Sequence, residues 1–395
     1  MSVERGKLDL RLRTVGRWSW IAGAAGLTAS LAGAWTRPSS FFPGYLFAYV
    51  FWLGLSLGAL AVLMIHYQVG GSWGFMTRRI LESATRVLPV LVVLFVPLLF
   101  GLRVLYPWAR PETVREDPHL LHQSPYLNPG FFVGRAAFYF ACWITCAGLL
   151  NRWSSLADRA ADPALWTLRR RLSGGGLALY ALTTYFASVD WVLSTEPRWS
   201  STIYGMLFIA GQGLAAFALI TSVVVLLSRE SPHRELVTGA LLNDLGNLLL
   251  TSVMLWAYLS FSQYLIIWSE NLPREVTWVA NRTSAGWRTI AVALIVLHFA
   301  VPFFLLLFRG VKTRGSWIAL VAFGLLVLRL LDDFWLVIPA FEPRGLAIHW
   351  TFLAPPVGIG GVWVGVFAGA LRRRPLVPLS DPLFQPVVAE ARIHG

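Results

Sequence analysis

Three ionisable residues lie together in the string RLLDDFW, inside an apolar stretch near the C-terminal end of the sequence. In a helix, Arg329 stands three and four residues before Asp332 and Asp333, so the three side chains share one face. One carboxylate can neutralise the arginine. The other needs a second arginine, such as Arg103 or Arg135, or holds a proton at neutral pH, as a proton relay requires. A purely architectural ion-pair network is the alternative.

Further polar residues lie in other apolar stretches, and their place in each stretch predicts their depth in a membrane. Asp190 and Gln263 fall near the outer side, His66 and Asp244 near the inner side, and His298 near the middle. An unpaired charge inside a bilayer costs about 3 kcal/mol or more, so these residues should face other helices and find partners there. With the RLLDDFW residues, they are the candidates for a quinone site or a proton pathway.

Asp190 has aromatic neighbours, since Trp191 follows it directly and Trp199 comes a few residues later. A quinol headgroup needs a proton acceptor for its hydroxyl and flat apolar walls, and this segment offers both. Tryptophans are also routine at membrane interfaces, so simple anchoring is the alternative.

The sequence predicts no metal ligated by the chain itself. His298 could accept a proton or bridge two helices, but a haem b needs two histidines at matching depth, and none accompanies it. The two cysteines, Cys142 and Cys146, stand one helical turn apart. They do not form an iron–sulfur, zinc or haem-attachment motif, and we expect them to pack between helices. Any metal redox centre would belong to another chain.

The fold class predicted is all-α, a single integral membrane domain over residues 1–395. The chain is 56% hydrophobic and only 13% charged, which is unusual for a soluble domain. About ten apolar stretches are each long enough for a helix to cross about 30 Å of hydrocarbon. The predicted spans are Val15–Trp35, Tyr45–His66, Val87–Tyr106, Phe131–Asn151, Gly175–Leu193, Thr202–Leu227, Leu245–Trp268, Arg288–Phe308, Ser316–Pro339 and Trp350–Ala370.

The net charge of +13 reflects membrane topology in this reading. Most Lys and Arg residues fall on the side of the N-terminus when the connections are assigned alternately to the two sides, which predicts that both termini are cytoplasmic. The basic residues would then contact anionic lipid, and no nucleic-acid partner is expected. The first apolar stretch follows a basic segment and lacks a clear cleavage site, so we expect a retained span rather than a signal peptide.

Two connections are long enough to carry features of their own. The outer connection from Pro107 to Gly130 holds acidic residues and histidines among prolines, and could dock a periplasmic partner or remain a solvated loop. The inner segment from Asn151 to Gly174 has the pattern of an amphipathic surface helix, with the run Arg169–Arg171 at the lipid headgroups.

A short internal similarity suggests a duplication. FWLGLSLGALA from Phe51 resembles FIAGQGLAAFA from Phe208, and both would run in the same direction through the membrane. The implied repeats are 45–193 and 202–339, two parallel four-helix bundles with the first and tenth spans outside them. Apolar sequence of low complexity can also produce such a match by chance.

Several strings resemble a known family. They are FFPGYLFAYVFWLGLSLGAL from Phe41, GGSWGFMTRRILE from Gly70, DWVLSTEPRWSSTIYG from Asp190, NDLGNLLLTSVMLWAYLSFSQYLIIWSENLP from Asn243, RLLDDFWLVIP from Arg329 and PLVPLSDPLFQP from Pro375. In this order they resemble the ActF-type membrane subunit of alternative complex III, a bacterial quinol:cytochrome c oxidoreductase, within the wider NrfD or polysulfide-reductase membrane-subunit family.

The resemblance implies a ten-helix subunit of the bacterial inner membrane without metals of its own. Its partners would be a homologous NrfD-like membrane subunit, an iron–sulfur protein and c-type cytochromes, and the complex would oxidise menaquinol or a similar quinol. The subunit itself would contribute a quinone-facing surface, a proton pathway, or both. The acidic positions of the family fall on Asp190, Asp244 and Asp332, with Arg329 and Gln263 beside them.

One position departs from the family pattern, because Asn243 stands where a histidine is expected before Asp244. Asparagine does not titrate, which puts proton entry at that point in doubt. Two other functions fit an all-helical membrane protein with buried charges. One is a stand-alone secondary transporter, and the other is a scaffold subunit that moves nothing.

Overall fold

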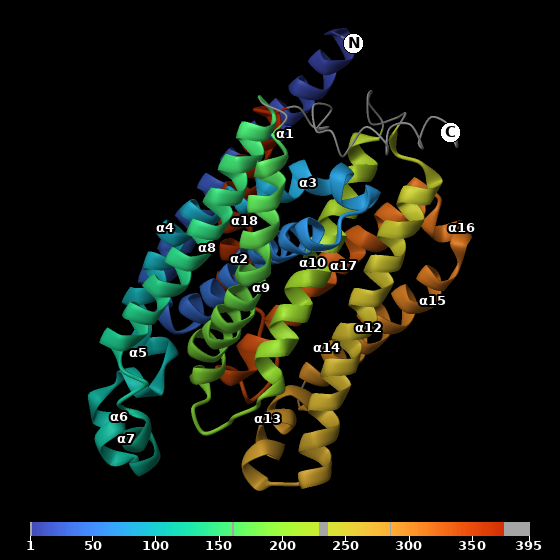
Figure 1. The fold of residues 1–395 in the computed structure, drawn as a ribbon. Coiled ribbons are helices and arrows are strands. Elements are labelled where there is room, and N and C mark those ends of the chain that lie inside the picture. The colour runs from blue at the N-terminus through green and yellow to red at the C-terminus, as the bar shows by residue number, and fades with distance from the viewer. Residues whose placement is uncertain (1, 160–161, 229–235, 285, 375–395) are drawn as a thin grey trace.

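The computed structural model describes residues 2–159, 162–228, 236–284 and 286–374 (Figure 1). Within these ranges the chain is helical and forms no strand. The C-terminal string from Pro375, which contributes to the family resemblance, lies outside the described residues.

The longer helices are α1 (Ser2–Thr36), α2 (Pro38–Val69), α3 (Ser72–Thr85), α4 (Leu88–Phe100), α8 (Pro129–Ala157), α9 (Pro163–Trp191), α10 (Ile203–Leu227), α12 (Gly239–Glu270), α13 (Pro273–Thr283), α17 (Gly315–Val337) and α18 (Trp350–Arg372). One further rod joins α14 (Trp287–Ala293), the π-helical η3 (Leu294–Ala300) and α15 (Val301–Leu307). Short elements connect them: α5 (Leu102–Leu105), η1 (Pro107–Ala109), α6 (Pro111–Glu116), α7 (Pro118–Gln123), η2 (Leu193–Thr195), α16 (Arg309–Lys312) and η4 (Ile338–Ala340).

The helix boundaries follow local sequence signals. Asn128 caps α8 by accepting a hydrogen bond from the Phe131 amide, and Asp162 and Thr238 cap α9 and α12 in the same way. Proline occupies the first turn of α2, α8 and α9, where its missing N–H costs no helical hydrogen bond. Asn271 ends α12 with φ of 50°, the left-handed conformation in which asparagine is tolerated.

Eight segments are long and apolar enough to cross a membrane among the described residues, and each overlaps a predicted span. They are Pro38–Val69, Ser72–Phe100, Pro129–Ala157, Ala164–Thr195, Ile203–Leu227, Gly239–Glu270, Trp287–Leu307 and Trp350–Arg372. The chain is therefore a multi-pass membrane protein. The predicted spans at 15–35 and 316–339 are helical, as α1 and α17, but are not among the eight.

The outward-facing side chains fit a lipid environment. Large apolar side chains are exposed on several helices, among them Tyr258 and Phe261 of α12 and Leu320 of α17, each more than 60% exposed. Soluble proteins rarely expose apolar surface on this scale. By contrast α2 is apolar along its length and buried on nearly all sides, as expected for a central helix.

Two groups of helices pack around α2 and α10. On one side α2, α4, α8 and α9 contact one another in sequence, and on the other α10, α12, the α14–α15 rod and α17 do so. Helices α2 and α10 also contact each other and join the two groups, which lie on opposite sides of Figure 1.

Helix α1 lies antiparallel along α18, outside the two groups. Gly26 meets Gly358 so closely that a Cβ on either residue would collide with backbone of the other helix. The pairing of Asp9 with Arg372, at 2.8 Å, places the start of α1 beside the end of α18. We call this end of the molecule the terminal end, and the opposite end, which carries α6, α7 and α13, the loop end (Figure 1).

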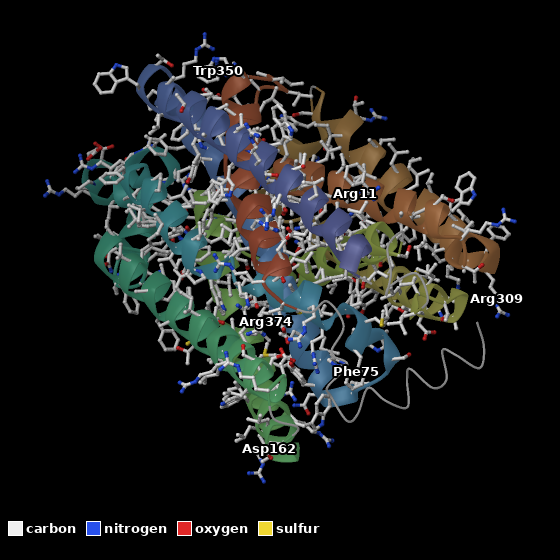
Figure 2. The ribbon with its side chains drawn as sticks, turned by 90° about the horizontal axis from the view of Figure 1, so that it is seen from above. Arg11, Phe75, Asp162, Arg309, Trp350 and Arg374 are labelled. Carbon is white, nitrogen blue, oxygen red and sulfur yellow. The ribbon has the colours of Figure 1, made fainter. Side chains whose placement is uncertain are left out.

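The segment from Asn151 to Gly174 does not form the separate surface helix that its sequence pattern predicts. Its residues belong to the end of α8 and the beginning of α9, both at the terminal end. Asp162, near the turn between these helices, marks the margin of the molecule when it is seen from this end (Figure 2). The amphipathic pattern arises because each long helix buries one face and exposes the other.

Candidate functional site

Arg329, Asp332 and Asp333 lie on one buried face of α17, as their spacing predicts. Each residue is 2% exposed. One terminal nitrogen of the Arg329 guanidinium donates a hydrogen bond to Asp332, and the other donates to Asp333 at 2.5 Å. A single cation therefore serves two carboxylates.

The second arginine considered from the sequence does not join this group. Arg135 binds Asp190 instead, and Arg103 is exposed in α5 at the loop end. Sequence position predicts depth along a helix but not the direction in which a side chain points, so both arginines were compatible with the pattern. Neither Arg103 nor Arg135 therefore pairs with Asp332 or Asp333 of α17.

Asp332 is linked to a second helix through Trp256 of α12. The indole Nε1 donates a hydrogen bond of 2.9 Å to Asp332 Oδ2. The same indole ring meets the imidazole of His298 edge-on, with ring centres 4.3 Å apart. His298 is fully buried, and neither of its ring nitrogens has a hydrogen-bond partner among the described residues. It lies in the π-helical η3, a distortion that occurs frequently at functional sites.

A small space adjoins the other side of the carboxylate pair. Its volume is about 10 Å³, roughly the room for one water molecule. Helix α17 contributes Arg329 and Asp333 to its wall, and α10 contributes Gln212. Gln212 Oε1 in turn accepts a hydrogen bond of 2.8 Å from the Tyr180 hydroxyl of α9. Polar groups thus continue from α17 across α10 to α9.

Gly211 is required for this arrangement. A Cβ at this position would collide with the Arg329 guanidinium, so the arginine packs directly against the backbone of α10. The same surface of α10 therefore holds the cation and presents Gln212 to the adjoining space.

Asp190 forms a separate, fully occupied site at the loop end. The Arg135 guanidinium donates to both carboxylate oxygens, at 2.8 and 3.0 Å, and the Tyr139 hydroxyl donates to Oδ2 at 2.8 Å. The guanidinium also lies 3.8 Å from the ring centre of Tyr126. Asp190 is 1% exposed, so its carboxylate oxygens are paired inside the protein and do not face an open space.

The aromatic neighbours of Asp190 are present but belong to the packed interior. Trp191 lies among Phe95, Phe140 and Trp143, with ring centres 4.9, 5.7 and 5.9 Å away. Trp199 stacks on Trp278 of α13, with ring centres 4.4 Å apart. These rings fill space between helices, and the flat walls predicted beside Asp190 are already covered by other rings.

Gln263 lines a cavity of about 530 Å³ between α9 and α12 near the loop end. The Ser201 hydroxyl donates to Gln263 Oε1 at 2.5 Å, and the amide is 5% exposed. Burial, with the negative charge of Asp190 nearby, raises the pKa of Tyr126 at the same cavity to about 12. Its hydroxyl therefore remains a hydrogen-bond donor at neutral pH. The other lining residues are Tyr185, Phe186, Val189, Leu193, Ser200, Ser201, Thr202, Ile203, Ile266, Ile267, Glu270 and Glu275.

His66 and Asp244, both predicted near the inner side of the membrane, have different surroundings. The His66 ring is fully buried and packs against Trp73, Phe75 and Trp166 at centre distances of 5.0 to 6.0 Å. The expectation that Asp244 faces other helices is wrong, because it is exposed on α12.

A buried charged group at the terminal end was not among the sequence candidates. Arg79 of α3 donates to Glu82 at 2.8 Å and also binds Asp158, and Glu82 accepts a hydrogen bond of 2.5 Å from Ser154. Arg374 reaches the same carboxylate at 3.4 Å. The spacing of Arg78 and Arg79 before Glu82 is the same signal as in RLLDDFW, but it lies outside the predicted spans.

The sequence candidates thus form one cluster and several separate sites. Arg329, Asp332, Asp333 and, through Trp256, His298 come together, which we call the α17 cluster. Asp190, Gln263, His66 and Asp244 each lie elsewhere. Among the described residues, no group of three or more His, Cys, Asp or Glu side chains is arranged to hold a metal ion.

Comparison with known proteins adds no relative, since no family model and no curated protein matches the chain. The likeness to ActF-type subunits therefore rests on the sequence strings alone.

Proposed function

We propose that the chain is a membrane subunit of a quinol:cytochrome c oxidoreductase of the alternative complex III type, and that its α17 cluster takes part in proton movement. The observation that carries the proposal is the sharing of one buried guanidinium by Asp332 and Asp333. Two ionised carboxylates and one arginine leave an excess negative charge in a buried site. A proton shared by the carboxylate pair removes that charge, and its reversible loss is the step a relay needs.

Neighbouring groups supply a route for such a proton. On one side the space beside Asp333 leads to Gln212 and the Tyr180 hydroxyl. On the other side Trp256 fixes Asp332 and contacts His298 at the middle of its helical rod. In this proposal Trp256 positions the carboxylate, because an indole N–H donates a hydrogen bond but accepts none. His298 contacts this indole but forms no hydrogen bond among the described residues, so the proposed proton route leads from Asp333 toward Gln212 and Tyr180.

The cavity beside Gln263 is the proposed quinone-facing surface. Its volume of about 530 Å³ suits a ligand of moderate size. Its wall is mainly apolar, and its polar groups include two carboxylates, Glu270 and Glu275. In the proposal the Gln263 amide and the Tyr126 hydroxyl bind a headgroup carbonyl or hydroxyl. The reductant would be menaquinol or a similar quinol. Asp190 does not face this ligand in the proposal, since Arg135 and Tyr139 occupy its oxygens.

The redox centres belong to partners in this proposal: an iron–sulfur protein, c-type cytochromes and a homologous NrfD-like membrane subunit. A cleft of about 540 Å³ at the loop end offers a surface for a periplasmic partner. It lies between the outer connection, at Pro107 and Asp117, and α13, at Trp278. In this proposal the protein lies in the bacterial inner membrane, with ten spans and both termini in the cytoplasm. We also propose that it consists of two duplicated four-helix bundles, which the two helix groups around α2 and α10 support.

A scaffold function is the second candidate, and the complete pairing of Asp190 favours it. Arg135 and Tyr139 supply three hydrogen bonds to this carboxylate, as in a purely structural network. If the α17 cluster is structural in the same way, removal of its titratable groups would leave turnover unchanged.

The test begins with purification of the tagged chain in mild detergent, an optical redox spectrum and a quinol:cytochrome c assay. Haem c signals and quinol-dependent reduction support the complex, and a solitary colourless protein favours a transporter. In the assembled complex, Asp333→Asn should lower turnover at least about tenfold. Asp244→Asn, the same change at an exposed site, is the matched control. If both variants have the same turnover and proton release, the α17 cluster does not move protons and the scaffold function is the remaining candidate.

A further inference from the structure

A groove at the terminal end is built from the end of α2 and the beginning of α9. It has a volume of about 420 Å³ and is lined by Gln68, Trp166, Thr167, Arg170, Arg171 and Gly174. Two of these residues are arginines and none is acidic. We propose that this groove, the Arg170 groove, binds the phosphate of an anionic phospholipid. The proposal is independent of the respiratory function proposed above.

The groove has the polar groups that a phosphodiester needs. Arg170 and Arg171 are both exposed to it and each offers several N–H donors. The Gln68 amide donates to the Arg170 carbonyl at 2.5 Å, which holds the end of α2 against α9. A Cβ at Gly174 would lie 3.2 Å from that amide nitrogen, so the glycine keeps this side of the groove open.

The wall behind the groove is rigid and carries further positive charge. Arg169 is 2% exposed, and its guanidinium lies 5.1 Å from the Tyr67 ring centre and 5.4 Å from that of Trp166. Trp166 also packs against His66 and Phe75, at 6.0 and 5.9 Å. Trp166 and Arg169 thus form a packed wall behind the two exposed arginines. An anion in it would experience the charge of Arg169 in addition to its direct partners.

The surface below the groove fits an acyl chain. An exposed stripe continues along α9 at helical spacing through Gly175, Ala178, Leu182 and Phe186. The first two have small side chains, while Leu182 and Phe186 are 61% and 45% exposed. About twenty residues of helix separate Arg171 from the end of α9, roughly the 30 Å of a hydrocarbon core. The arginines then lie at headgroup level, which favours a lipid over free phosphate.

The test measures phosphatidylglycerol retained by the full-length chain, with any co-purifying subunits, after gel filtration in non-ionic detergent. The double variant Arg170→Gln with Arg171→Gln should retain the lipid at least about fivefold less well than wild type. The matched control is Arg152→Gln with Arg159→Gln, which removes the same charge from exposed positions at the same end of the molecule. It should retain the lipid like wild type. If both double variants lose the lipid equally, the loss reflects the total positive charge of this end rather than a specific site, and the proposed site is wrong.

A second measurement keeps the proposal testable if the groove variant does not fold. Wild-type protein should retain phosphatidylglycerol in preference to phosphatidylcholine, and 10 mM inorganic phosphate, on the order of a saturating level for a weak anion site, should not displace it. Equal retention of both lipids would contradict an anionic headgroup site. Displacement by phosphate would show that the groove binds the free anion.

Discussion

Asp333 accepts a hydrogen bond of 2.5 Å from the same Arg329 guanidinium that binds its sequence neighbour Asp332. The three residues are adjacent on one buried helix face, so the carboxylates cannot separate without leaving the cation. This coupling makes the charge of the group depend on all three residues, and it determines how the group responds to substitution.

Replacement of Arg329 should expose the cost of two buried carboxylates without a cation. We expect Arg329→Met to lower the stability of the protein by about 3–5 kcal/mol, because one partner of a buried ion pair is removed while the other remains. The measurement is the free energy of unfolding in detergent, with the unfolding monitored by circular dichroism.

A compensated variant is the control for this change. Arg329→Met combined with Asp332→Asn and Asp333→Asn removes the whole charged group, and should recover most of the lost stability. If the triple variant is as unstable as the single one, packing of the arginine stem rather than charge accounts for the loss.

Two neighbouring glycines of α10 offer a paired test of how Arg329 is seated. Gly211→Ala introduces a Cβ that collides with the guanidinium, and we expect a loss of about 1–3 kcal/mol. A Cβ at Gly213 would have no neighbour within 4 Å, so Gly213→Ala should be neutral or slightly stabilising through helix propensity. Thermal unfolding of both variants measures the difference. Similar losses at both positions would contradict the close approach of Arg329 to α10.

Asp190 should behave as a structural residue. Asp190→Asn weakens three charge-assisted hydrogen bonds with Arg135 and Tyr139, and we expect a stability loss of about 2–3 kcal/mol. Once assembled, the complex should retain its turnover, in contrast to Asp333→Asn. If the Asp190→Asn protein is stable but has no turnover, Asp190 is a functional residue and this prediction is wrong.

Local spacing predicted the parts of the site that lie on one helix. The shared face of Arg329, Asp332 and Asp333 follows from separations of three and four residues, and α17 confirms it. Contacts between helices were not predictable in this way, because position along a span specifies depth and leaves the direction of the side chain open. Arg135 was therefore considered for the wrong aspartates, and Asp244 was expected inside although it is exposed.

The limits of the predicted spans explain the remaining differences. Glu82 was not predicted as a buried site residue because α3 lies before the apolar run of the third predicted span. The charged residues of α3 were therefore assigned to a connection outside the membrane. The all-helical fold was easier to predict, since apolar runs of membrane length have few alternatives to helix. The partnership of Trp256 with Asp332 and His298 joins three helices, and no pattern within any one of them indicates it.

The outer connection supplies a pH-dependent contact outside the membrane spans. Arg198 donates to Asp117 at 2.9 Å and holds the pKa of that carboxyl below its ordinary value of 3.8. A carboxyl with a lowered folded-state pKa contributes stability above its unfolded pKa, and loses it as the pH falls through the folded value. The contact should therefore be intact at neutral pH and weaken below about pH 4. Because the Arg198 side chain is 74% exposed, salt should weaken it further.

Asp117→Asn is the variant that measures this contact. The difference in Tm between wild type and variant should be present at pH 7 and should shrink as the pH is lowered below 4, since protonation removes the same charge from the wild-type protein. The difference should also shrink at 1 M salt, where the Debye length is about 3 Å. A difference that persists unchanged at low pH would contradict the ion pair with Arg198 as its source, since asparagine can still cap the His119 amide.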